Sequence, residues 1–124
     1  MSESAASNAP PSVHVPRATQ PVLMEILLRL RIYLQQLYQE RFDRLVLFGS
    51  YATGTAHPGS DVDILIVLHD PIDESEELHK TSPFVAQLCL DHNLLISRLF
   101  MATSRYKAES SPLLRNIRAE GIVI

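Results

Sequence analysis

Two carboxylates and a glycine–serine pair are the residues of this chain best suited to chemistry. Gly49 and Ser50 follow a short apolar run, and Asp61 and Asp63 open a second apolar run ten residues after Ser50. Alternate residues of a strand point to the same face, so we expect the two carboxylates to lie side by side. Like charges this close repel each other, and a divalent cation would neutralise both. Mg²⁺ prefers such oxygen ligands and is often held by one or two carboxylates together with substrate phosphates.

The Gly49-Ser50 turn could contact the same phosphates. Glycine has no side chain to keep a ligand from the backbone. The backbone N–H groups of such a turn, with the Ser50 hydroxyl, can donate hydrogen bonds to phosphate oxygens. The alternative is a purely structural turn beside two solvated carboxylates. The combination of the turn with the carboxylate pair at this spacing favours a nucleotide site over that alternative.

The stretch GSYATGTAHPGSDVD, residues 49–63, resembles the GS-x10-D-x-D signature of the polymerase-β-type nucleotidyltransferases. The short chain resembles their minimal (MNT) branch. A second glycine at Gly54, a serine at Ser60 before the first aspartate, and the flanking apolar strands add to the likeness. The likeness extends over residues 22–124, because the ending at residues 111–122 also looks like endings in this branch. It implies an α/β (α+β) fold, with a small mixed β-sheet flanked by helices.

The resemblance also implies a reaction and a set of site residues. In the related enzymes a nucleoside triphosphate binds with Mg²⁺, an acceptor group attacks the α-phosphorus, and pyrophosphate leaves. Such transfer depends mainly on positioning and on charge neutralisation. By resemblance, Asp61 and Asp63 are the catalytic residues and hold the metal. Gly49, Ser50 and Ser60 would bind the nucleotide.

The chain departs from the family pattern at a third carboxylate. Active members usually carry an aspartate on the next strand, beside the D-x-D pair. The corresponding segment, residues 94–100, contains neither Asp nor Glu and has Ser97 at the polar position. A hydroxyl is a weak substitute for a charged metal ligand or a base. Asp91 precedes this strand and is the alternative acid, although the expected register does not favour it.

Two functions remain open for this site. Minimal relatives are often encoded beside a helical HEPN-domain protein and act as antitoxins that transfer AMP onto the toxin. The resemblance therefore implies AMP transfer from ATP, or another nucleoside triphosphate, to a protein acceptor. The alternative, favoured by the missing third acid, is an inactive relative that binds and neutralises its partner without chemistry.

Composition narrows the classes of protein to which this chain can belong. The chain has 124 residues, 46% of them apolar, a formal charge of −3 and a pI near 5.9. This size is typical of one domain, and the acidic balance argues against a nucleic-acid polymerase or repair enzyme, which usually needs a basic surface. The lone Cys89 excludes an internal disulfide. Without a leader pattern or an apolar run long enough to span a bilayer, we expect a cytoplasmic protein.

The pattern of apolar residues predicts the elements that position the site. Residues 1–20 are rich in Ser, Ala and Pro and are expected to form a disordered tail, and residues 21–124 to form the nucleotidyltransferase domain. The predicted strands cover residues 45–48, 62–68 and 94–101, and the predicted helices cover residues 21–40, 50–53, 74–91, 103–109 and 112–120. Pro83 interrupts the third helix, so either this helix kinks or a new one begins at Ser82.

Several side chains of these elements have a structural interpretation. The candidate core residues of the third helix are Leu78, Val85, Leu88 and Cys89. Tyr33 and Tyr38 could extend the first helix to a partner surface, although ordinary packing is favoured. Arg98 has the opposite strand parity to Ser97, which favours a structural role. His57, on the loop before Ser60, is expected to be solvated rather than a nucleotide ligand.

Overall fold

The computed structural model describes residues 20–124, and the tail predicted for residues 1–20 therefore lies outside the described residues except at Gln20. The elements follow the chain in this order: α1 (Gln20–Tyr38), η2 (Gln39–Arg41), β2 (Phe42–Phe48), α2 (Ser50–Thr53), β3 (Val62–Leu68), α3 (Glu74–His92), β4 (Ile96–Ala102), α4 (Thr103–Ala108), α5 (Pro112–Glu120) and β5 (Ile122–Val123).

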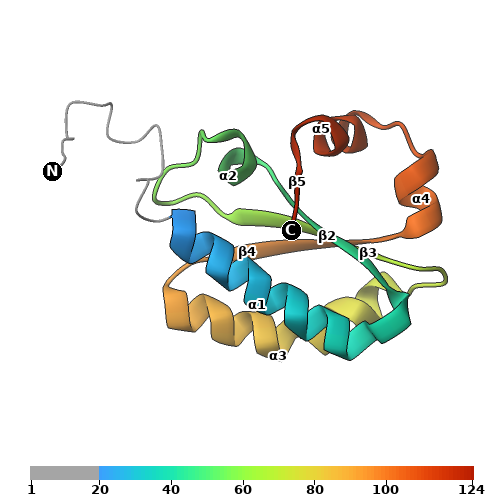
Figure 1. Cartoon of the computed structure of the whole chain (residues 1–124), viewed down its shortest axis with the longest axis horizontal. Helices are drawn as coiled ribbons and strands as arrows, with labels where there is room; N and C mark the ends of the chain where they lie inside the picture. Colours follow the sequence, from blue (N-terminus) through green and yellow to red (C-terminus); the bar gives the residue numbers. More distant parts are fainter. Residues whose placement is uncertain (1–19) are drawn as a thin grey trace, which may run out of the picture.

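The four described strands form one mixed sheet in the order β4-β3-β2-β5. Strand β2 is antiparallel to both β3 and β5, whereas β3 is parallel to β4. Helices α1 and α3 cover one face of the sheet, and α4 and α5 lie on the other side (Figure 1). The short helix α2 lies at one end of the sheet, where Tyr51 and Ala52 pack against the core beneath α1 and α3. The expected small mixed sheet flanked by helices is therefore confirmed.

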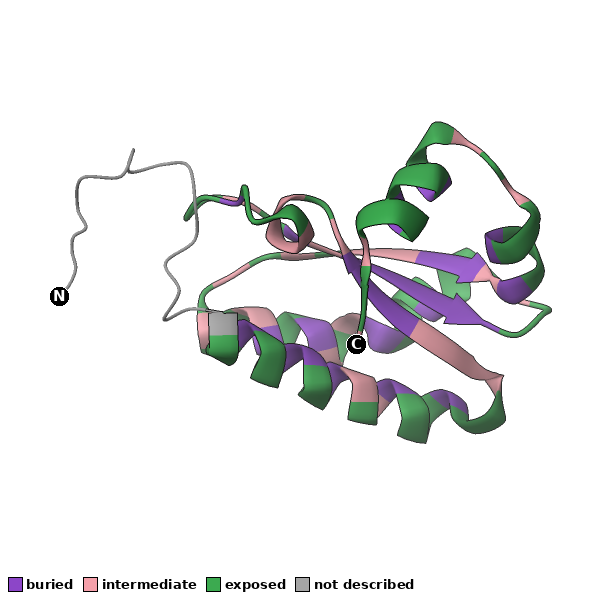
Figure 2. Ribbon diagram, turned by 45° about the horizontal axis from the view of Figure 1, so that its top comes forward, coloured by how far each residue is buried: buried purple, intermediate pink, exposed green. Residues whose placement is uncertain are grey.

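Strand β3 is central because its side chains are apolar on both faces after Asp63. Ile64 and Ile66 belong to the core beneath α1 and α3, and Leu65 and Val67 belong to the smaller core beneath α4 and α5. All four side chains are fully buried, and the centre of the sheet is correspondingly purple in Figure 2. A strand covered on both faces is held firmly, so the residues at its start have a rigid support.

Helices α1 and α3 pack against each other along their length. The Tyr33 and Phe84 rings stack with centroids 3.9 Å apart, and the Tyr38 hydroxyl donates to Oε1 of Glu77 at 2.8 Å. Tyr38 is buried and Tyr33 is partly buried, and both pack against α3, which agrees with the ordinary packing favoured for them. Their contacts fix α1 to α3 as one layer beneath the sheet.

Helix α3 continues through Pro83 without a break. Proline has no N–H, so one helical hydrogen bond is missing there. The hydroxyls of the two residues before Pro83 bond to the preceding turn: Thr81 Oγ1 donates to the Glu77 carbonyl at 3.0 Å, and Ser82 Oγ to the Leu78 carbonyl at 2.8 Å. A second helix beginning at Ser82 is therefore wrong.

Other expectations are corrected by long-range contacts. Strand β2 begins at Phe42, earlier than expected, because Phe42 pairs with Leu68. Strand β5 was not expected, and it forms because its two residues pair with β2. Leu78 is 38% exposed and is not a core residue. Cys89 is only partly buried.

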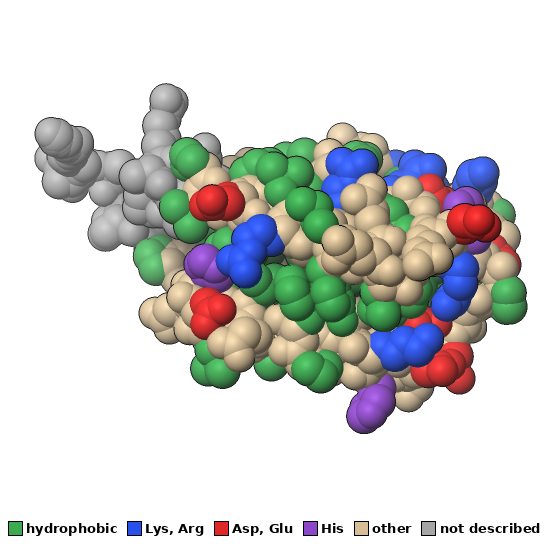
Figure 3. All heavy atoms as spheres, turned by 60° about the horizontal axis from the view of Figure 1, so that its bottom comes forward, with side chains coloured by type: hydrophobic (Ala, Val, Ile, Leu, Met, Phe, Trp, Pro, Cys, Tyr) green, Lys and Arg blue, Asp and Glu red, His purple; other side chains and the backbone are tan. Residues whose placement is uncertain are grey.

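The outer face of α1 and α3 mixes apolar and charged side chains (Figure 3). Met24, Leu28 and Ile32 follow one another at four-residue spacing and are 39–55% exposed.

Among the described helices, none combines the length and the apolar character needed to cross a membrane.

Candidate functional site

The turn at Gly49 links β2 to the short helix α2. Gly49 has φ 75° and ψ −157°, a conformation open to glycine and strained for other residues. Its carbonyl accepts hydrogen bonds from the N–H groups of Ala52 and Thr53 at 3.0 and 3.2 Å. The chain therefore reverses sharply at the end of β2, and the first N–H groups of α2 have no partner within the helix.

Gly49 lies directly against the carboxylate of Asp63. Phe48 pairs with Asp63 across β2 and β3. A Cβ atom added at Gly49 would lie 3.2 Å from Cγ and 3.3 Å from Cβ of Asp63, and it would collide with Oδ2. Helix α2 and the following loop separate Gly49 from Asp63 in the sequence, and the fold brings the two residues into contact. Only glycine permits this close approach.

Asp61 and Asp63 form a pair of negative charges without a compensating partner among residues 20–124. Asp61 is exposed and immediately precedes β3, while Asp63 is partly buried within it. Burial, and secondarily the charge of Asp61, raises the pKa of the Asp63 carboxyl above its ordinary value. Neither side chain forms a hydrogen bond or an ion pair with another described residue. A carboxylate pair in this state is suited to a bound cation.

The residues fit a metal ion that takes most of its ligands from substrate and water rather than from the protein. Within residues 20–124, no group of three or more His, Cys, Asp or Glu side chains could hold a metal ion. Asp61 and Asp63 would therefore be the carboxylate ligands, and substrate phosphates and water would complete the coordination, as is common for Mg²⁺. A bound ion would supply neutralisation of phosphate charge.

Ser97 lies beside Asp63, in the position where the third acid was expected. The two residues are direct partners in the parallel pairing of β3 with β4. Asp91 lies in α3, where its Oδ1 accepts a hydrogen bond from Gln87 Nε2 at 2.8 Å. Arg98 points to the opposite side, toward α3, and donates to Thr81 Oγ1 at 2.5 Å. The register thus places a hydroxyl beside the carboxylate pair, and Arg98 has the structural role expected for it.

Ser60 closes the loop that leads into the carboxylate pair. Its N–H donates to the His57 carbonyl at 2.8 Å, and its Oγ accepts from the His57 N–H at 3.1 Å. Both bonds lie within the loop and hold the chain just before Asp61. A nucleotide contact for Ser60 stays a prediction, as do the phosphate contacts of Gly49 and Ser50.

A cavity next to the turn includes residues that the sequence pattern alone did not single out. It has a volume of about 250 Å³ and lies between the Phe48-Gly49 segment and α5. The lining residues on α5 recur at helical spacing: Leu113, Asn116, Ile117 and Glu120. Ser111 caps this helix by accepting the Leu114 N–H at 3.3 Å. In the sequence, Asn116 and Glu120 stand at helical spacing among apolar residues, which was the available signal. That spacing can be linked to the site only once the position of α5 is known.

Comparison with known proteins agrees with the motif. The model of a family described as a nucleotidyltransferase domain matches residues 27–122. A protein adenylyltransferase candidate from Methanocaldococcus jannaschii is 31% identical over 75 residues, which cover 60% of this chain and 75% of the relative.

Solved structures share the fold at low sequence identity. A nucleotidyltransferase candidate from Sulfolobus solfataricus has a TM-score of 0.62 and 13% identity, covering 86% of this chain and 82% of its own. A toxin-antitoxin structure with AMP-PNP has a TM-score of 0.52 and 22% identity, and the match covers 75% of this chain and 68% of the chain in that structure. A mutant of the MntA-HpeT toxin-antitoxin has a TM-score of 0.53 and 19% identity, and the match covers 77% of this chain and 69% of the chain in that structure. With the family match over most of its length, this chain belongs to the nucleotidyltransferase domain family.

Proposed function

We propose that this chain transfers AMP from ATP to a protein acceptor in the presence of Mg²⁺. The observation that carries the proposal is the uncompensated carboxylate pair of Asp61 and Asp63, with Asp63 held against the backbone of Gly49. That arrangement leaves negative charge next to an open turn. A cation together with a triphosphate satisfies both features at once.

The relatives support the donor and the acceptor class. The Methanocaldococcus jannaschii protein is named for adenylyl transfer to protein, and one structure of the same fold was solved with AMP-PNP. Two of the similar folds come from toxin-antitoxin structures. A helical HEPN-type toxin is therefore the acceptor we propose, in line with the resemblance to the minimal branch.

Each residue has a defined task in this proposal. The turn at Gly49 and Ser50 binds the β- and γ-phosphates through N–H groups and the Ser50 hydroxyl. Asp61 and Asp63 would hold the cation, and Ser60 fixes the loop before them. The acceptor oxygen forms a bond to the α-phosphorus, and the bond from this phosphorus to the bridging oxygen breaks. Pyrophosphate leaves, and the acceptor proton passes to solvent.

The test is transfer of label from α-phosphate-labelled ATP to a co-purified partner protein. The native chain should label the partner at saturating Mg²⁺. The double variant Asp61→Asn with Asp63→Asn should not, while retaining its fold by circular dichroism. Equal labelling by a folded double variant would overturn the assignment of these carboxylates.

Ser97 favours a second candidate function, namely partner binding without turnover. It is the side chain paired with Asp63 on β4, so no carboxylate occupies that position. The same assay separates the two candidates. A native chain that binds both ATP and the partner but transfers no label acts as a binding module.

A further inference from the structure

The cavity between the Gly49 turn and α5 is the strongest unassigned feature of the described chain. It is lined by Phe48 and Gly49 on one side and by four residues of α5 on the other, and it is partly open to solvent. Gly49 thus belongs both to this cavity and to the turn beside Asp63. Asp63 shares a face of β3 with Leu65 and Val67, and this is the face that α5 covers (Figure 1). A ligand bound at the turn can therefore extend into the cavity.

The walls of the cavity suit a flat, uncharged group. Phe48, Leu113 and Ile117 supply apolar surface, and Ile117 is only 2% exposed. Among the described residues, no lysine or arginine lines the cavity. Glu120 lies at the end of α5, where the carbonyl groups of the helix add partial negative charge. Phosphate is disfavoured there, whereas N–H and O–H donors are favoured.

Asn116 and Glu120 are the polar groups available to such a ligand. They lie four residues apart, so both project from one side of α5. Both residues are exposed, and neither side chain bonds to another described residue. An asparagine amide can pair with the N6 and N7 positions of adenine through one donor and one acceptor. A carboxylate accepts hydrogen bonds from hydroxyl groups.

We infer that this cavity is the nucleoside subsite of the donor nucleotide. Asn116 contacts the adenine edge, Glu120 accepts from the ribose hydroxyls, and Phe48 with Leu113 packs against the ring. The volume of about 250 Å³ is below the range of roughly 300–1,000 Å³ for whole drug-sized ligands. Only the nucleoside part would be enclosed, with the triphosphate lying outside along the turn. The inference rests on the proposed function and specifies its donor.

Calorimetry on the full chain with Mg²⁺ tests this subsite using four probes: ATP, GTP, 2′,3′-dideoxy-ATP and inorganic tripolyphosphate. Asn116→Ala should weaken ATP binding about tenfold, the lower part of the range for such a contact, and reduce the preference for ATP over GTP. Glu120→Gln should weaken ATP several-fold and leave dideoxy-ATP unchanged. Tripolyphosphate binding should be unaffected by either variant.

Arg115→Ala is the matched control, since Arg115 is an exposed α5 residue outside the cavity. If all three variants bind ATP like the native chain, while Asp61→Asn with Asp63→Asn abolishes binding, the subsite is wrong and the proposed function stands. Failure of the native chain to bind ATP would overturn both. Unchanged melting temperatures would establish that the variants are folded.

Discussion

Carboxylates in two parts of this molecule have opposite surroundings. In the layer of α1 and α3, Glu77 is 2% exposed, accepts from the Tyr38 hydroxyl at 2.8 Å and pairs with Arg41 at 3.0 Å. Burial alone would raise the pKa of Glu77, but the hydrogen bonds from Tyr38 and Arg41 and the charge of Lys80 hold it below its ordinary value. At the Gly49 turn, Asp63 has no such partner and its pKa is raised.

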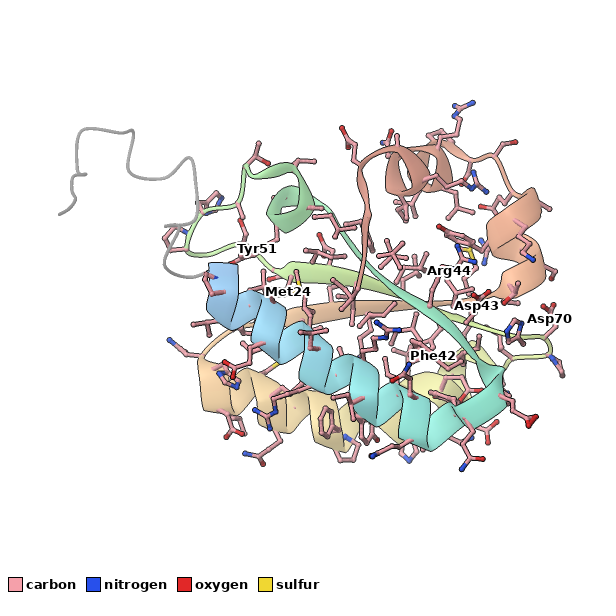
Figure 4. The ribbon with its side chains drawn as sticks, viewed as in Figure 1. Met24, Phe42, Asp43, Arg44, Tyr51 and Asp70 are labelled. Carbon is pink, nitrogen blue, oxygen red and sulfur yellow. The ribbon has the colours of Figure 1, made fainter. Side chains whose placement is uncertain are left out.

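The far end of the sheet repeats the partnered arrangement. Asp43 accepts from the Thr103 hydroxyl at 2.7 Å and from Arg44 Nε at 3.1 Å. These bonds lower the pKa of Asp43 despite its burial. Figure 4 shows Asp43, Arg44 and Asp70 at one end of the sheet and Tyr51, of α2, at the other. Carboxylates that hold the fold are neutralised by neighbouring protein groups, whereas the pair at the turn has no such partner among the described residues.

The largest effect should come from removing the unpartnered charges. Asp61→Asn with Asp63→Asn should lower AMP transfer by about a thousandfold, the upper range for losing preorganised electrostatic stabilisation. The melting temperature without metal should stay the same or rise, because a repulsive pair is removed. Label transfer and thermal unfolding in EDTA measure the two effects. A large fall in melting temperature would mean that these carboxylates hold the fold as well.

Removing the partnered carboxylate of Glu77 should lower stability and leave the site unchanged, the reverse of the effect at Asp61 and Asp63. Glu77→Ala should destabilise the chain by about 3 kcal/mol, since Tyr38 loses its acceptor and Arg41 its ion pair. Urea unfolding gives this value, with the exposed neighbour changed in Glu76→Ala as the control. ATP affinity of the folded fraction should remain native. A loss below about 0.5 kcal/mol, the usual range at surface sites, would remove the contrast between the two regions.

Adding an acid beside Asp63 on β4 tests whether the carboxylate pair lacks a third carboxylate. Ser97→Asp should raise AMP transfer by about tenfold if it supplies a base for the acceptor, since general-base catalysis contributes about a hundredfold or more when geometry is ideal. It should also lower stability slightly without metal, because a third negative charge joins two others. Ser97→Asn is the matched uncharged control. Equal transfer by the native chain and both variants would show that Ser97 lies outside the reaction.

The smallest expected effect is on the pH dependence of stability. The folded-state pKa of Glu77 is lowered from 4.5, so its ionised form stabilises the fold above that pH. The stabilisation is lost as the pH falls below 4.5 and through the folded-state pKa. The difference in melting temperature between the native chain and Glu77→Gln should therefore shrink as the pH is lowered from neutral into the acid range. A difference that grows in acid would reverse the sign assigned to Glu77.

Local sequence was enough to place the turn, the carboxylates and the central strand. Gly49 and Asp63 are separated by a short helix and loop, and an unbroken apolar run after Asp63 allows only a covered strand. The position of Ser97 next to Asp63 was expected from the family resemblance, in which an acid usually stands at that place on the next strand, and the pairing of β3 with β4 agrees with it. These features depend on the order of residues within a few dozen positions.

Only the tertiary structure decided the rest of the site and the edge of the sheet. The two-residue strand β5 exists because it pairs with β2, where Val46 is the partner of Val123 and Leu47 is the partner of Ile122. Those partners are far apart in the sequence, with β5 at the end of the chain and β2 near its first third, so their pairing leaves no trace in local periodicity.

The same holds for the wall that α5 builds beside Gly49. Asn116 and Glu120 are ordinary polar residues of a short amphipathic helix until that helix is placed against the turn. The exposure of Leu78 likewise depends on which side of α3 meets the sheet. Residue spacing determines which side chains share a face, but packing between distant elements determines what each face meets.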